Sequence, residues 1–161
     1  MEQTSGNVYV TRERLAELEN ELKILKTTER KEIAERIAEA RSHGDLTENA
    51  EYSAAKEAQS HLEMKIGKLE NILSRVMILN KDDIPSDEVY VLSTVKLHDI
   101  SFNEEITYTL VSPEEADFEQ NKISIKSPLG QALLGKKVGE FIELDISSNK
   151  SKYKILEIIK P

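Results

Sequence analysis

The sequence has no cysteine and no tryptophan, and only three phenylalanines, six glycines and four prolines among its 161 residues. A chain without cysteine forms no disulfide and no thiolate metal site, which fits a reducing cytoplasm. An apolar run is missing at its start as well, because residues 1–10 are too polar and too short for a signal peptide or a membrane span. We therefore expect a cytoplasmic protein that enters no membrane.

A surplus of positive charge is also missing. The formal net charge is −8, and lysine and arginine are scattered among the acids. Because no global basic field is available for duplex DNA, any contact with nucleic acid has to be local or secondary to a protein partner. Charged residues make up 32% of the chain and aromatic residues 5%, a balance typical of solvent-exposed helix, and it is concentrated in the first half.

No catalytic set of nucleophile, base and orienting group is recognisable. The three histidines, His43, His61 and His98, match no motif. The later glycines precede strand patterns rather than the Lys-Ser/Thr step of a phosphate-binding loop. A self-contained enzyme is not expected.

The first half predicts two long helices that pack against each other. The first helix covers residues 12–42, about 31 residues or roughly 45 Å, which is long for an isolated surface helix. Its seam slips by one residue between Leu25 and Ile33, where the repeat drifts toward 3.67 residues per turn. The residues that begin this seam repeat at three and four, as in a coiled coil: Leu15, Leu18, Leu22 and Leu25.

The second helical pattern supplies the partner and extends to about Leu79. Its apolar face alternates at three and four along Tyr52, Ala55, Gln59, Leu62, Ile66, Leu69, Leu73 and Val76. Alanines gather where the two helices meet residues 43–52, and small residues let helices approach closely. The pattern predicts a hairpin with a slender tip.

The predicted tip, residues 43–52, holds three carboxylates within seven residues. If a helix begins here, Asp45 and Glu48 point the same way at its exposed end, because they are three residues apart. The simpler interpretation is a capping box, with Asp45 as the N-cap and Glu48 at N3. Gly44 fits a left-handed residue closing the first helix, and His43 fits its C-terminal end.

The second half predicts an α+β unit, a small and mostly antiparallel sheet with one or two short helices. Two Ser-Pro steps, at Ser112 and Ser127, favour short helical starts. The predicted strands are residues 89–97, 106–111, 123–125, 140–146 and 153–159. We assign residues 1–80 to the hairpin, 81–88 to a linker and 89–161 to the second domain.

Carboxylates at a hairpin tip suit chemistry in the site of another macromolecule. Mg²⁺ prefers oxygen ligands and is usually held by one or two carboxylates together with water and phosphate oxygens. A second ion in a phosphoryl-transfer site clamps the oxygens and helps to make a water nucleophilic. Asp45 and Glu48 are therefore the candidate residues for this chemistry.

Several stretches resemble the bacterial transcript cleavage factors of the GreA/GreB family, GreA more than GreB. The specific motif is Gly-Asp-Leu-x-Glu-Asn-Ala-Glu-Tyr, which starts at Gly44. The resemblance covers nearly the whole chain, along residues 38–52, 54–57, 127–130 and 133–139. It implies an FKBP-like second domain after the coiled-coil hairpin.

The resemblance also implies a function. Such factors insert the hairpin through the secondary channel of RNA polymerase while the second domain docks at the channel's rim. Acids matching Asp45 and Glu48 help hold the second Mg²⁺ and a water at the polymerase's own active site. Backtracked RNA is then cleaved near its 3′ end, so the factor stimulates rather than catalyses alone. We expect the free protein to be a monomer that binds no cofactor.

The family's other functional positions map onto the chain residue by residue. Arg41 and Lys56 match a basic patch for the extruded RNA strand. Without the family, the favoured interpretation of each is an exposed helix side chain paired with a nearby Glu. The loop that faces the rim matches Ser127, Pro128 and Leu129. Gln131 departs from the family, which often has a basic residue there, and this weakens the expectation of strong docking.

Two other functions stay open at this point. A pure channel binder that modulates the polymerase without cleavage is disfavoured by the intact Asp-Leu-x-Glu tip. A prolyl isomerase is suggested only by the implied FKBP-like domain. With no Trp and three Phe residues, an aromatic-lined proline pocket is not expected.

Overall fold

The computed structural model describes residues 6–161, which form two compact units. One unit is the helical hairpin, Glu13–Arg75, and the other combines the residues up to Arg12 with Val76–Pro161. The segments before and after the hairpin thus both belong to the sheet unit. The division of the sequence at residues 80 and 88 stays a prediction, whereas the compact units divide at Arg12 and Arg75.

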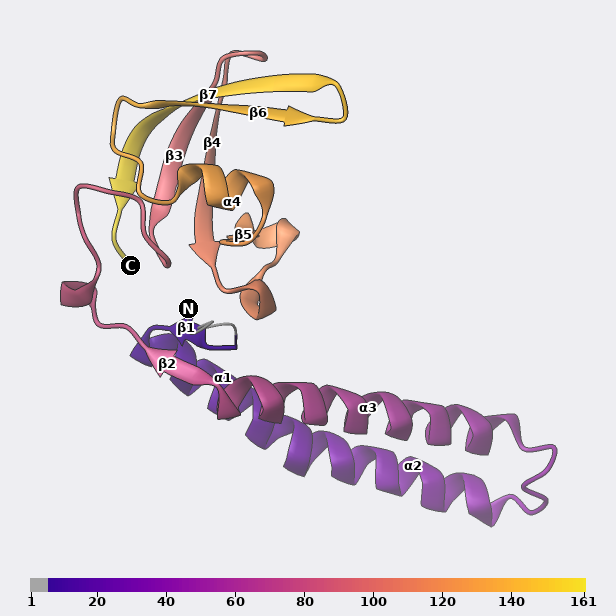
Figure 1. Cartoon of the computed structure of the whole chain (residues 1–161). Coiled ribbons are helices and arrows are strands. Elements are labelled where there is room, and N and C mark those ends of the chain that lie inside the picture. The colour runs from indigo at the N-terminus through magenta and orange to yellow at the C-terminus, as the bar shows by residue number, and fades with distance from the viewer. Residues whose placement is uncertain (1–5) are drawn as a thin grey trace. The chain divides into compact units, whose positions relative to one another are not determined.

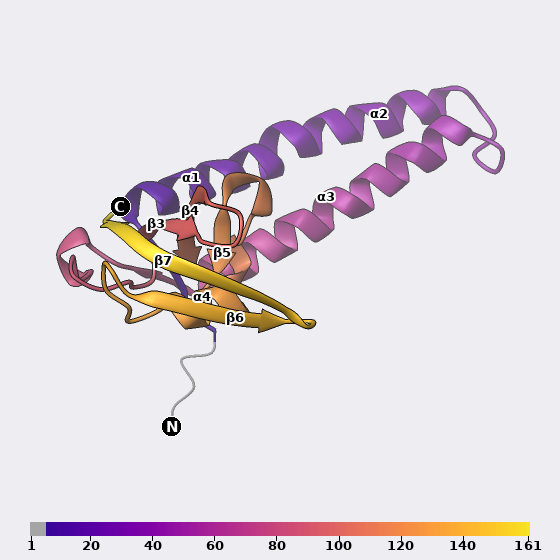
Figure 2. The same cartoon turned by 90° about the horizontal axis from the view of Figure 1, so that it is seen from above.

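The hairpin is made of two long antiparallel arms, as the leucine and alanine spacing predicts (Figures 1 and 2). The first arm consists of α1 (Arg12–Ile24), η1 (Leu25–Glu29) and α2 (Arg30–Ser42), and the second arm is α3 (Ala50–Ser74). The buried residues of both arms follow the predicted seam: Leu18, Leu25, Ile37, Ala40, Ala55, Leu62, Ile66 and Leu69.

The slip in the seam corresponds to a π-helical segment, η1. A π turn holds one residue more than an α turn, so the apolar stripe resumes one position later. Within η1 the Thr27 hydroxyl donates to the carbonyl of Lys23 at 2.7 Å. The apolar seam therefore stays between the arms on both sides of η1.

Towards the tip the arms meet through small residues. Ala40 on α2 and Ala55 on α3 are 2% and 1% exposed, so the side chains buried near the tip are small, and small residues let helices approach closely. Ion pairs join the arms nearer the base, with Lys26 Nζ 3.2 Å from Glu70 Oε1. The prediction of a slender hairpin end is consistent with this packing.

A bidentate ion pair also joins the two arms at mid-length. Arg30 donates from Nε and Nη2 to the two carboxylate oxygens of Glu63, at 2.9 and 2.8 Å. These hydrogen bonds raise the pKa of Arg30 and lower that of Glu63. Both side chains are exposed, so the pair fixes the alignment of the arms more than it adds to stability.

The second unit is built on a five-stranded sheet in the order β5-β4-β3-β7-β6. The strands are β3 (Thr94–Asp99), β4 (Glu104–Val111), β5 (Lys122–Ser124), β6 (Phe141–Ile146) and β7 (Asn149–Ile159). All neighbours are antiparallel except β4 and β5, which run parallel. The predicted fold class, a helical hairpin followed by a small α+β sheet domain, is confirmed.

Both Ser-Pro steps open short helices, as predicted. Pro113–Glu115 forms the 3-10 helix η3, and Pro128–Leu133 forms α4. Leu133 of α4 is fully buried in the core of the sheet unit. The rest of that buried core comes from Val89, Val95, Leu97, Leu110, Ile142 and Ile155.

One strand prediction and one helix prediction need correction. The strand expected over residues 89–97 begins only at Thr94, because Leu92 has a positive φ of 73° and Val89 bonds instead to Gly135 and Lys136. The helical face expected to reach Val76 ends earlier, since α3 stops at Ser74. A periodic apolar pattern does not by itself reveal where backbone hydrogen bonds change partner.

Val76 belongs instead to β2 (Val76–Ile78), which pairs in parallel with β1 (Val8–Val10). The Tyr9 N–H donates to Oγ of the fully buried Ser112 at 2.9 Å. These contacts attach the chain on both sides of the hairpin to the sheet unit.

The predicted linker is partly ordered by the sheet unit. Lys81–Asp83 forms the 3-10 helix η2, and Ile84 beside it is 1% exposed within a small apolar cluster. Within residues 6–161, no helix is long and apolar enough to cross a membrane.

Candidate functional site

The hairpin tip is an exposed loop between Ser42, where α2 ends, and Ala50, where α3 begins. Gly44 has a φ of 105°, so it is the left-handed residue that the sequence predicts after α2. The following side chains, including Leu46 at 41% exposure, face solvent. The predicted candidate residues Asp45 and Glu48 therefore lie at the end of the hairpin and not against its helices.

The predicted capping box at the tip is wrong. The N-cap of α3 is Asn49, whose side-chain oxygen accepts from the Tyr52 N–H at 3.0 Å. Asp45 and Glu48 precede this cap and are not part of the helix. Their carboxylates are consequently not used to satisfy the first amides of α3, which removes the simpler interpretation of this pair.

Asn49 has a second role that sequence reasoning missed. Its side-chain N–H₂ donates to the carbonyl of Ala40 at 2.6 Å, so one side chain joins the start of α3 to the last turn of α2. An asparagine directly before a helical pattern is a known N-cap signal, but the bond across the hairpin has no signature in the sequence. The loop is thereby closed at its base.

Asp45 is held by Thr47. Its Oδ1 accepts from the Thr47 backbone N–H at 3.0 Å and from the Thr47 hydroxyl at 2.8 Å. These two bonds, the backbone one being the stronger cause, lower the pKa of Asp45 below its ordinary value. The carboxylate is therefore ionised at neutral pH, and its direction is set by a local turn.

Asp45 and Glu48 share an open hollow of about 410 Å³ at the tip. The other residues lining it are His43, Asn49, Ala50 and Glu51. His43 Nε2 lies 3.8 Å from Glu51 Oε2, so the residue that follows α2 contacts the first turn of α3. The structure thus brings the two predicted acids to one solvent-open surface.

The donor atoms of this hollow suit a hard cation only in part. Carboxylate oxygens are the ligands that Mg²⁺ prefers, and an octahedral ion is usually completed by water and phosphate oxygens. Among residues 6–161, no cluster of three or more His, Asp or Glu side chains has the arrangement of a metal site. Asp45 and Glu48 thus offer carboxylate oxygens of the preferred kind but not a complete set of ligands.

The two predicted RNA-contact residues are both exposed near the tip. The Arg41 guanidinium lies over the Tyr52 ring, 5.9 Å from its centroid, and Lys56 donates to Gln59 Oε1 at 2.9 Å. Neither cation pairs with a glutamate in the described part of the chain, contrary to the alternative interpretation of these residues. Their charges are available to an anion, although nothing in the structure tests an RNA contact.

The predicted docking loop lies where β5 passes into α4. Ser127 caps α4, since its Oγ accepts from the Gly130 N–H at 3.1 Å and donates to the Ser124 carbonyl at 2.6 Å. Pro128 is exposed, whereas Leu129 packs partly against the core. Of the three predicted residues, Pro128 offers the most surface to a partner.

Gly130 explains why this loop lies so close to β5. A Cβ at that position would overlap the backbone carbonyl of Ser124, so only glycine allows the approach. Gln131, next along the helix, is exposed. It is therefore well placed to affect contacts made by the loop.

Comparisons with known proteins match both halves of the chain. Residues 8–78 match the family model described as transcription elongation factor, N-terminal, of GreA and GreB. Residues 84–160 match the one described as transcription elongation factor, GreA/GreB, C-term.

Individual relatives agree with these matches. Transcription elongation factor GreA of Chloroherpeton thalassium is 50% identical over 154 residues, covering 96% of this chain and 98% of its own. The GreA of Chlorobaculum parvum is 51% identical over 155 residues, with the same coverage. Among solved structures, Gfh1 of Thermus aquaticus is 29% identical, with 96% and 99% of the two chains covered and a TM-score of 0.46.

Proposed function

The chain belongs to the GreA/GreB family of transcription elongation factors, and from this premise we propose that it stimulates RNA cleavage by a stalled RNA polymerase. In this proposal the hairpin enters the secondary channel of the polymerase and the sheet domain docks at the channel's rim. Backtracked RNA is cleaved near its 3′ end, and elongation resumes from the new terminus. The observation that carries the proposal is the pair of exposed acids, Asp45 and Glu48, on one hollow at the tip.

The hairpin has the dimensions for reaching a buried site. Its first arm, 31 residues from Arg12 to Ser42, is roughly 45 Å long at the rise of an α-helix. The side chains buried near the tip, Ala40 and Ala55, are small and let the arms approach closely. A narrow rod of this kind carries two carboxylates to a place that a globular domain does not reach.

At the tip, this chain supplies charge and orientation. Asp45 is fixed by Thr47 and ionised, and Glu48 lines the same hollow. In the proposed complex they would contribute oxygen ligands to a second Mg²⁺, which supplies Lewis-acid chemistry and helps to make a water nucleophilic when bound. The remaining ligands would come from the polymerase and the RNA phosphates. The chain therefore acts in trans and is not an enzyme by itself.

Arg41 and Lys56 would neutralise phosphates of the extruded RNA strand in this arrangement. Phosphate contacts of this kind position a strand without reading its sequence. The cation–π contact places the Arg41 guanidinium of α2 over the Tyr52 ring of α3, beside the tip. Pro128 and its neighbours would contact the rim.

The decisive test is RNA cleavage in a backtracked elongation complex, with and without this protein, at varied Mg²⁺. We expect wild type to accelerate cleavage, and Asp45→Asn or Glu48→Gln to abolish that acceleration. In Asp45→Asn the amide oxygen still accepts from Thr47, so the tip keeps its shape and thermal unfolding stays nearly unchanged. Glu35→Gln, an equal charge change on an exposed position of α2, is the matched control and should cleave as wild type does.

The outcomes separate the possibilities. Undiminished cleavage with both tip variants would show that the acids are not the working groups. Binding to the polymerase without any stimulated cleavage by wild type would indicate a channel binder that modulates transcription in another way.

A further inference from the structure

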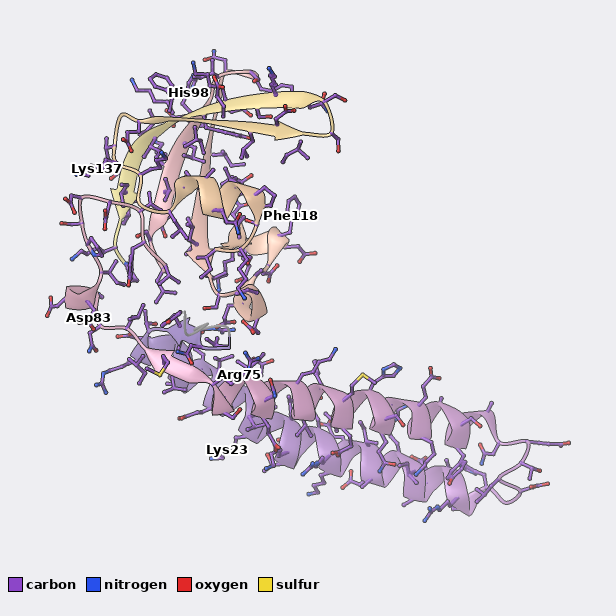
Figure 3. All side chains as sticks on the ribbon, viewed as in Figure 1. Lys23, Arg75, Asp83, His98, Phe118 and Lys137 are labelled. Carbon is purple, nitrogen blue, oxygen red and sulfur yellow. The ribbon has the colours of Figure 1, made fainter. Side chains whose placement is uncertain are left out.

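Phe118 is the most exposed large apolar side chain in the described residues, at 87% of its surface. It begins the 3-10 helix η4 (Phe118–Gln120), and its side chain points away from the sheet unit in Figure 3. A single exposed apolar residue needs no explanation, but a fully exposed aromatic ring on a fixed turn has the form of an interface anchor.

The turn that carries Phe118 is held by several hydrogen bonds. Asp117 Oδ1 accepts from the Glu119 N–H at 3.0 Å, and the Asn121 N–H donates to the Phe118 carbonyl at 3.1 Å. Asp117 and Lys122 exchange two backbone bonds of 2.9 Å. Because its backbone is already ordered, presenting the ring to a partner costs little additional entropy.

The two residues next to Phe118 in the sequence are both acidic. Asp117 and Glu119 flank it in sequence, and Glu119 is exposed. A surface that receives Phe118 therefore needs an apolar hollow bordered by lysine or arginine, since like charges there would be unfavourable.

Phe118 also lies close in the fold to the predicted docking loop. β5 separates the two turns, beginning just after Asn121 and ending three residues before Ser127. A three-residue strand is roughly 10 Å long, so both turns fit within one interface of ordinary size.

We propose that Phe118 is an anchor of the surface that docks on the protein partner, together with the loop around Pro128, and that it inserts into an apolar hollow with a basic border. The proposal rests on the proposed function, in which that partner is RNA polymerase. Single-stranded RNA is the less suitable occupant, although its bases can stack on an aromatic ring, because its phosphates would meet Asp117 and Glu119.

The test measures binding of the full chain to core RNA polymerase by competition or fluorescence. Phe118→Ala should weaken binding about thirtyfold or more, the size of effect that truncating a hot-spot residue produces. Phe118→Leu should recover part of the affinity. Phe102→Ala is the matched control, because Phe102 is 74% exposed on the turn before β4, at the other end of β4 from the segment that pairs β5.

Two charge-reversal variants test whether the acidic residues next to Phe118 contribute to binding. Glu119→Lys should weaken binding, and Glu104→Lys, an exposed acid beside Phe102, should not. Phe118→Ala should unfold at the wild-type temperature, since the ring is exposed. At saturating concentration it should still support cleavage, because the tip is intact.

Failure of the Phe118 anchor and failure of the proposed function give different results. If wild type binds and stimulates cleavage while Phe118→Ala binds equally well, the anchor is wrong and the proposed function stands. If wild type neither binds nor stimulates, the proposed function fails. If the free chain binds an RNA oligonucleotide and only that binding requires Phe118, the protein-docking assignment is overturned.

Discussion

The Asn49 side chain joins the two arms of the hairpin, because it donates to the Ala40 carbonyl on α2 while its oxygen caps α3 at Tyr52. One residue thus determines both where α3 begins and how far the tip loop opens. The Asn49 bonds thus fix the base of the loop that carries Asp45 and Glu48.

We predict that Asn49→Ala loosens the tip. Loss of an N-cap lowers the free energy of unfolding by about 0.5–2 kcal/mol, and the Ala40 carbonyl loses its partner as well. Amide hydrogen exchange should rise at residues 43–52, and cleavage stimulation should fall although both acids are present.

Asn49→Asp separates the two roles of this residue. The carboxylate still caps α3 but cannot donate to Ala40, so exchange should increase mainly in the loop and less in the first turn of α3. Equal protection in Asn49→Asp and wild type would show that the bond across the hairpin has no influence on the tip.

The pKa of Asp45 should depend on Thr47. Its ordinary value is 3.8, and the Thr47 N–H and hydroxyl lower it. Thr47→Val keeps the N–H and removes the hydroxyl, so the pKa should rise part of the way back. Carbon-detected NMR titration of the Asp45 carboxyl in wild type and in Thr47→Val measures this.

The sign of the pH effect follows from the same shift. A folded-state pKa below the unfolded value stabilises the fold fully above the unfolded pKa, and this contribution is lost as pH falls through the folded value. The tip should therefore keep its shape at neutral pH and loosen only below about pH 4, since the ordinary pKa of Asp45 is 3.8. Loosening near pH 6 would contradict this account.

Close packing near the tip should not tolerate a larger side chain. Ala55→Leu places three extra carbons between the arms at a position that is 1% exposed, and overpacking of this kind lowers stability by about 1–3 kcal/mol. Ala54→Leu, on the exposed side of the same helix, should change stability by less than about 0.5 kcal/mol. Thermal and urea unfolding of both variants give the comparison.

Two glycines should respond in opposite directions to alanine. Gly130→Ala introduces a Cβ that overlaps the Ser124 carbonyl, so α4 must move and stability should fall by about 1–3 kcal/mol. Gly67→Ala meets nothing within 4 Å inside α3 and should raise stability by about 0.5–1 kcal/mol. Chemical unfolding measures both, and a stable Gly130→Ala would show that the loop has room to move.

Local patterns in the sequence account for much of the fold. Leucines at three and four predict the arms, and the slip between Leu25 and Ile33 marks the π-helical segment. The Ser-Pro steps predict η3 and α4 correctly, because proline at the first helical position acts through neighbours only. The tip acids are recognisable because their motif lies within nine consecutive residues, 44–52.

Contacts between distant residues account for what sequence reasoning missed. The parallel pairing of Val76 with Val8 ends α3 early, and the turn around Leu92 delays β3 until Thr94. Phe118 belongs to no recognisable motif. Its exposure follows from which other apolar residues fill the core, and this is known only from the folded structure.

The sequence alone determined the hairpin, the α+β second domain and the chemical identity of the tip, because helix periodicity, turn residues and carboxylates act over a few positions. Only the tertiary structure decided that Asn49 caps α3, so that Asp45 and Glu48 stay in the open loop. That choice depends on the carbonyl of Ala40, a partner nine residues away that becomes available only once the two arms have packed.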